Sequence, residues 1–63
     1  MALPTLPEFT AAVEQELRLL GESFAWGDLL EYAAAVWQSA RADPDPGRWA
    51  RAFLREVPAP PAG

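Results

Sequence analysis

Few side chains in this sequence have the chemistry of a nucleophile, and none of them has a suitable base available. The hydroxyl groups belong to Thr5, Thr10, Ser23, Tyr32 and Ser39. Because the sequence contains no histidine, lysine or cysteine, no imidazole or amine can activate these hydroxyls. The same absences remove the imidazole and thiolate ligands of most zinc and iron–sulfur sites. We therefore expect no enzyme activity, no catalytic residue, no metal site and no cofactor.

Three arginines near the carboxyl end are candidates for a charged contact surface. Arg48, Arg51 and Arg55 fall on one stripe of a predicted helix, on the side opposite its apolar residues. A guanidinium group pairs bidentately with carboxylates and with phosphates, so the stripe fits an acidic protein or a nucleic-acid backbone. The alternative interpretation is a solvated helix face without a partner.

The charge is unevenly divided along the chain, whose formal net charge is −4. Residues 1–31 carry six acidic side chains and one arginine, a net charge of −5. Residues 32–63 carry four arginines and three acidic side chains, a net charge of +1. The two halves can pair within one molecule, pair head-to-tail between copies, or leave the acidic half free to bind a basic partner.

Three large side chains lie away from the centres of the predicted apolar stripes. Trp26 falls in a predicted turn, where it either closes one end of the fold or protrudes as a contact residue of the kind enriched at interface hot spots. Leu19 points away from the core and forms a small apolar patch with Ala12, and Tyr32 lies at the edge of its stripe. The predicted partner-binding residues are therefore Leu19, Trp26, Tyr32, Arg48, Arg51 and Arg55.

Helical segments must position these residues, and the first is predicted over about residues 6–20. Thr5 is a suitable N-cap, and Glu8 three residues later completes a capping box. Pro7 lies in the first turn, where the missing N–H costs nothing. Gly21 is a natural residue for the end of this helix.

The second helix is predicted over about residues 28–42 and the third over about residues 46–57. We favour Asp28 as the N-cap of the second, because Gly27 inside a helix would cost about 1 kcal/mol. In the alternative, Ser23 caps a helix that runs through Gly27. For the third helix, Asp45 is the N-cap and Pro46 occupies the first helical position, which favours proline.

The apolar stripes of these helices predict an all-α fold, a compact three-helix bundle that forms one domain over residues 1–57. Helices of this length are unstable alone in water, so they must pack on one another. Residues 58–63 are rich in proline and are predicted to be a disordered tail. The expected core consists of Leu6, Phe9, Val13, Leu17, Leu20, Leu29, Val36, Trp37, Trp49 and Phe53.

The functional expectation is a small non-catalytic protein–protein interaction module: an adaptor, accessory subunit or regulator. Its partner would be another protein chain, or a second copy that completes the core across a two-fold axis. No signal peptide or membrane span is recognisable, so we expect a cytoplasmic protein that does not contact the membrane. All basic residues are arginine and alanine is abundant, as is typical of a GC-rich bacterial genome.

The alternative is a small DNA-binding regulator, such as the DNA-binding part of an antitoxin, with residues 46–57 as its recognition helix. Two features weigh against nucleic acid as the partner. The link before this helix is longer than the turn of a helix-turn-helix unit and is stiffened by two prolines. The net charge of −4 also opposes the phosphate backbone.

Overall fold

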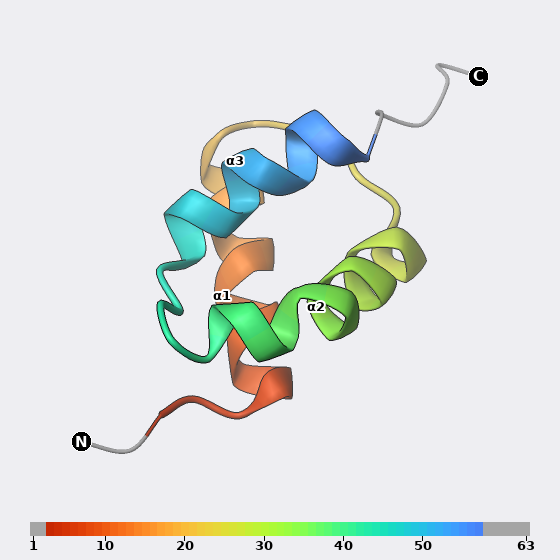
Figure 1. The fold of residues 1–63 in the computed structure, drawn as a ribbon. Coiled ribbons are helices and arrows are strands. Elements are labelled where there is room, and N and C mark those ends of the chain that lie inside the picture. Colours follow the sequence, from red (N-terminus) through yellow and green to blue (C-terminus); the bar gives the residue numbers. More distant parts are fainter. Residues whose placement is uncertain (1–2, 58–63) are drawn as a thin grey trace.

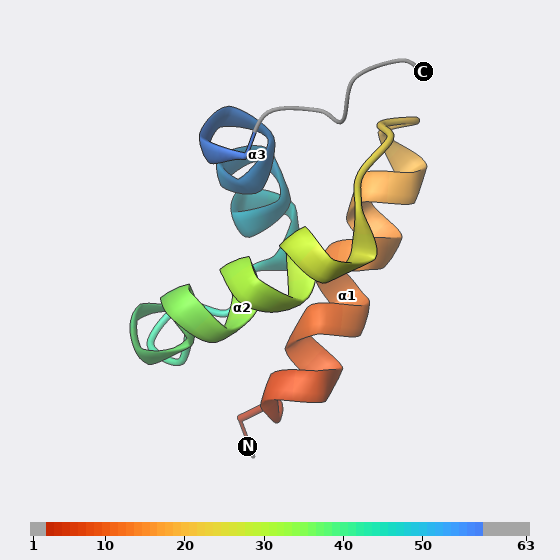
Figure 2. The ribbon, with the colours of Figure 1, turned by 90° about the vertical axis from the view of Figure 1, so that its right-hand side faces the viewer.

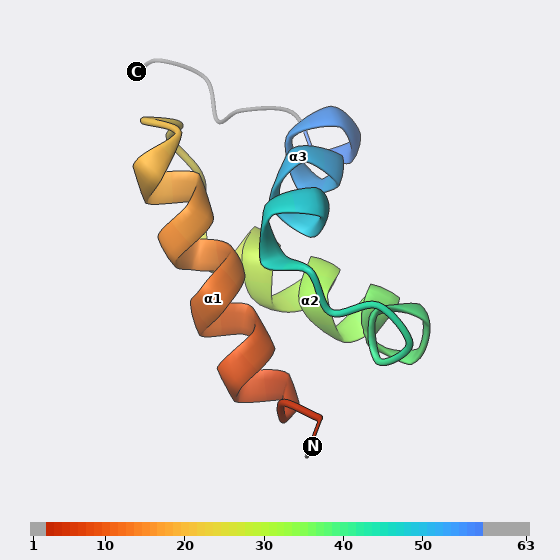
Figure 3. The same ribbon diagram turned by 90° about the vertical axis from the view of Figure 1, so that its left-hand side faces the viewer.

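The structure is a computed structural model that describes residues 3–57, and within them every regular element is a helix. The helices are α1 (Leu6–Leu19), α2 (Trp26–Ala40) and α3 (Pro46–Glu56). In Figure 1, α1 lies behind both α2 and α3. Figures 2 and 3 show α2 and α3 together on one side of α1, inclined steeply to one another. The predicted all-α three-helix fold is confirmed, while the tail at 58–63 lies outside the described residues.

The two ends of α1 follow the local signals in the sequence. The Glu8 backbone N–H donates to the Thr5 hydroxyl, and the Thr5 N–H donates to the Glu8 carboxylate at 2.9 Å, so the capping box is complete. The hydrogen bond from the Thr5 backbone N–H to the carboxylate, followed by a contribution from the Thr5 side chain, holds the pKa of Glu8 below its ordinary value. At the other end, Gly21 has a φ of 73°, and the Glu22 N–H donates to the Leu17 carbonyl at 3.2 Å, which forms a Schellman motif.

Both predicted starts of α2 are wrong. The N-cap is Ala25, which has no side-chain cap, and the helix begins at Trp26 with Gly27 in its second position. The cost of about 1 kcal/mol applies to glycine in the interior of a helix, and Gly27 lies in the first turn. Asp28 is not the N-cap of α2 but lies in its first turn. In the first turn, the positive end of the helix dipole still stabilises its carboxylate.

The predicted start of α3 is confirmed, and hydrogen bonds and an ion pair join the preceding turn to this helix. The Asp45 carboxylate accepts from the Gly47 N–H at 3.2 Å, and Pro46 is the first helical residue. The Trp49 indole N–H donates to the Asp43 carbonyl at 2.7 Å, and the Asp43 carboxylate pairs with Arg48. Residues 41–45 are therefore a fixed connection between α2 and α3.

The core lies where the three helices cross, and it differs from the predicted core at several positions. Leu20 was expected to be buried but is 49% exposed, whereas Leu17 in the last turn of α1 is fully buried. Tyr32 is only 8% exposed and belongs to the core. Four predicted core residues are partly buried and pack against it: Leu6, Val36, Trp37 and Trp49. The buried hydrophobic residues are Phe9, Val13, Leu17, Leu29, Tyr32, Ala33, Ala40, Ala50 and Phe53.

Candidate partner-binding surface

Trp26 is the aromatic side chain that the described fold leaves most accessible. It is the first residue of α2, and it is 47% exposed. Leu30, one turn further along α2, is exposed to a similar extent. Trp26 therefore leaves about half of its surface accessible, and it forms an apolar edge with Leu30.

An apolar groove lies between this edge of α2 and the amino-terminal half of α1. Its volume is about 340 Å³, and its lining residues are Leu6, Pro7, Thr10, Ala11, Trp26 and Leu30. Thr10 does not make the groove polar, because its hydroxyl donates to the Leu6 carbonyl of its own helix at 2.8 Å. The groove is thus an apolar surface without a charged lining residue.

A second, polar concavity lies on the other side of Trp26. Its volume is about 440 Å³, and its lining residues are Glu14, Arg18, Glu22, Ser23, Phe24 and Trp26. Arg18 donates from Nε and Nη2 to one carboxylate oxygen of Glu14, at 3.3 and 2.9 Å. Glu22 forms no ion pair with any described residue. The concavity therefore presents one uncompensated carboxylate beside an exposed indole.

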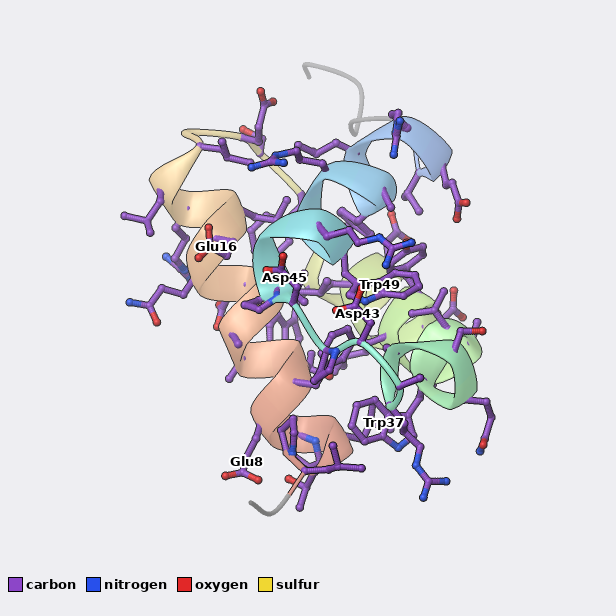
Figure 4. All side chains as sticks on the ribbon, turned by 60° about the vertical axis from the view of Figure 1, so that its left-hand side comes forward. Glu8, Glu16, Trp37, Asp43, Asp45 and Trp49 are labelled. Atoms are coloured by element: carbon purple, nitrogen blue, oxygen red, sulfur yellow. The ribbon has the colours of Figure 1, made fainter. Side chains whose placement is uncertain are left out.

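The predicted arginine stripe is exposed on α3, but its members are not equivalent. The Arg48 guanidinium pairs with Asp43 and lies over the Trp49 ring, 5.5 Å from its centroid. Figure 4 shows Asp43 and Trp49 together at the start of α3. Within residues 3–57, Arg51 and Arg55 form no ion pair. Arg48 thus holds the connection before α3, and two arginines remain for an external contact.

The other two predicted contact residues lie in different environments. Leu19 is 74% exposed and lines neither of the two concavities. Tyr32 faces Phe53 edge-on, with ring centroids 5.3 Å apart, and its hydroxyl is buried without a hydrogen-bond partner in the structure. Burial raises the pKa of Tyr32, the Glu56 carboxylate raises it further, and Arg55 opposes this shift. The fold therefore does not present Tyr32 to a partner.

The sequence analysis named Trp26 as a contact residue, but it did not predict the groove around it. Leu6 was assigned to the core, and no contact role was predicted for Pro7, Ala11 or Leu30. The sequence feature that could have indicated these residues is their spacing. Pro7 and Ala11 lie one helical turn apart, and so do Trp26 and Leu30. Spacing alone does not show that these two pairs face one another, since that depends on how α1 and α2 cross.

No known protein family, curated protein or solved structure matches the chain. Within residues 3–57, no group of three or more acidic, histidine or cysteine side chains has the arrangement of a metal site. Among the same residues, no helix has both the length and the apolar character needed to cross a membrane. The surface around Trp26 is therefore interpreted from its own chemistry.

Proposed function

We propose that this chain is a small non-catalytic protein–protein interaction module that acts as an adaptor, accessory subunit or regulator. The observation that carries the proposal is the 47% exposure of Trp26, whose side chain lines two concavities. Tryptophan is the residue type most enriched among interface hot spots, and hot spots lie in pockets that a partner fills. The absence of histidine, lysine and cysteine supports a binding function over a catalytic one.

The test compares three versions of the tagged full chain as baits in cells that naturally express it: wild type, Trp26→Ala and Leu19→Ala. A protein recovered with the wild type is then produced separately, and its affinity for each purified bait is measured by calorimetry. We expect Trp26→Ala to weaken binding by about 30-fold or more, the effect of a hot spot worth ~2 kcal/mol. Circular dichroism should show nearly unchanged helix content, because Trp26 is not one of the buried core residues.

Leu19→Ala is the matched control, because Leu19 is more exposed than Trp26 but lines neither concavity. The sequence analysis placed Leu19 among the contact residues, but the structure leaves it outside both concavities, so we expect this variant to bind like the wild type. Binding that survives Trp26→Ala but fails with Leu19→Ala would move the contact surface to the end of α1. The complete absence of a protein partner for the wild type, in extract and after reconstitution, would contradict the proposed function.

DNA binding through α3 is the second candidate, and it is favoured by the exposure of Arg51 and Arg55 without ion pairs in the described part of the chain. Arg48 supports it less, because its guanidinium is engaged by Asp43. Retention on heparin at low salt that disappears in an Arg51→Ala/Arg55→Ala variant would support phosphate contact. A wild-type chain that flows through heparin would exclude it.

A further inference from the structure

We infer that the groove beside Trp26 binds a short amphipathic helix of another protein, one that carries a large apolar side chain and cationic residues. This inference rests on the proposed function and specifies the chemistry of the partner. It follows from the two concavities that share Trp26: one of them is apolar throughout, and the other carries Glu14, Arg18 and Glu22.

The apolar groove determines which kind of side chain a partner can insert. The lining between Leu6 and Ala11 covers little more than one turn of α1, and Trp26 and Leu30 face it across the groove. A volume of about 340 Å³ is enough for one or two large apolar side chains. A helix laid along such a groove anchors itself with apolar residues spaced three or four positions apart.

The polar half of the site fixes the charge of the partner. Glu14 lies about one turn beyond Thr10 and Ala11 on α1, and Arg18 is already paired with it. The net charge of the polar lining is therefore −1, located at Glu22. A cationic side chain one or two turns from the apolar anchor would meet this negative potential.

A second copy of the chain fits the site less well than a basic helix does. A two-fold contact through this face would place the acidic residues of both copies against one another. The arginine-bearing helix α3 has no exposed large hydrophobic residue for the groove among those described. Leu19 and Leu20 are exposed, but acidic residues flank them at Glu16 and Glu22.

The experiment is a selection from a displayed library of helical peptides, about four turns long, with the wild-type chain as target and Trp26→Ala as counter-target. One face of each peptide carries leucine or phenylalanine, and each position of the other face is lysine or glutamate with equal frequency. We expect the selected peptides to be enriched in lysine and to bind the wild type at least tenfold more tightly than Trp26→Ala. Leu30→Ala, a second substitution in the groove, should weaken binding in the same direction.

The charge requirement is tested with one selected peptide and two variants that change the net charge equally. Glu22→Gln should weaken binding severalfold and reduce its dependence on salt. Glu56→Gln on α3 should leave both unchanged, because Glu56 lies near Tyr32 and lines neither concavity. Equal effects of the two variants would show that only net charge matters and would overturn the assignment to this site.

The remaining outcomes separate this inference from the proposed function. Selected peptides that depend on Trp26 but are enriched in glutamate, or in neither residue, would overturn the cationic partner and leave an interaction module. If no peptide distinguishes the wild type from Trp26→Ala while a natural partner does bind the chain, the helix-in-groove inference is wrong. Self-association that Trp26→Ala abolishes, measured by sedimentation, would identify a second copy as the occupant and overturn the inference.

Discussion

The hydroxyl of Tyr32 is a buried polar group that finds no hydrogen-bond partner in the described structure. The ring itself is well placed, because it packs edge-on against Phe53 in the centre of the core. An unpaired buried hydroxyl costs about 1–3 kcal/mol of desolvation free energy. At this position the aromatic ring stabilises the fold and the oxygen opposes it.

Replacing Tyr32 with phenylalanine should therefore raise the free energy of unfolding by up to ~1 kcal/mol, or leave it unchanged, at neutral pH. Urea denaturation followed by circular dichroism measures this directly. A loss of more than ~1 kcal/mol would show that the hydroxyl has a partner after all.

The same substitution should remove a pH dependence of stability. The pKa of Tyr32 is raised in the folded state, so as the pH rises above about 10 the unfolded chain loses this proton first and stability falls. The sequence contains no lysine or cysteine and one tyrosine, so Tyr32 is the side chain that titrates in this range. The wild type should become less stable towards alkaline pH, while Tyr32→Phe should stay nearly constant until arginine titrates.

At the scale of the helices, local sequence signals predicted the ends that they control directly. Thr5 with Glu8, Gly21, and Asp45 with Pro46 set the limits of α1 and the start of α3 to within about one residue. Each acts through a hydrogen bond or a backbone angle within a few residues of itself. These limits were therefore accessible without knowledge of the tertiary fold.

The start of α2 was not accessible in this way, because Ala25 has no side chain that could cap a helix. Ser23 and Asp28 offered two competing local signals, and the fold uses neither as the cap. Phe24 packs against Phe53, with ring centroids 6.4 Å apart, and the helix begins immediately after this contact. Tertiary packing therefore sets the start of α2, and with it the exposure of Trp26 and the shape of the groove.

Gly27 lies in the first turn of α2, and Gly21 lies just after the end of α1. Replacing each with alanine should change the stability of the fold in opposite directions. Gly27 is helical, and a Cβ atom there would meet nothing within 4 Å. Gly27→Ala should stabilise the fold by about 0.4–1 kcal/mol, because alanine loses less backbone entropy on folding. Gly21 has a φ of 73°, so Gly21→Ala should destabilise the fold by about 1–2 kcal/mol.

Thermal and urea denaturation of both glycine variants test this pair. Each variant adds the same methyl group. A difference in the sign of the two changes in the free energy of unfolding would therefore come from the backbone conformation at each glycine. A destabilising Gly27→Ala would mean that α2 begins after residue 27, as the sequence alone had favoured.

At the scale of the whole molecule, the helices depend on one another through a small shared core. Phe9 of α1 contacts Trp37 of α2, with ring centroids 5.3 Å apart, and Trp49 of α3, with centroids 6.5 Å apart. Tyr32 of α2 and Phe53 of α3 provide an aromatic contact between these two helices. None of the three helices is long enough to be stable alone in water.

Substitution of Phe9 should therefore unfold all three helices together. A chain of 63 residues is expected to have a free energy of unfolding of roughly 3–9 kcal/mol. Phe9→Ala should cost about 3–5 kcal/mol, because Phe9 is 1% exposed and its removal leaves a cavity. The expected result is loss of most helical circular dichroism at moderate temperature, with coincident transitions by circular dichroism and tryptophan fluorescence.

The controls for Phe9→Ala distinguish a shared core from three independent segments. Phe9→Leu keeps most of the buried volume and should retain the helices with reduced stability. Leu30→Ala removes an exposed side chain and should change stability by less than ~0.5 kcal/mol. If Phe9→Ala loses only the helical signal of α1, while Trp37 and Trp49 stay in a folded environment, then α2 and α3 form a unit of their own. In that case α1 would be a docked element, and the groove between α1 and α2 would open and close with it instead of being a fixed feature of the fold.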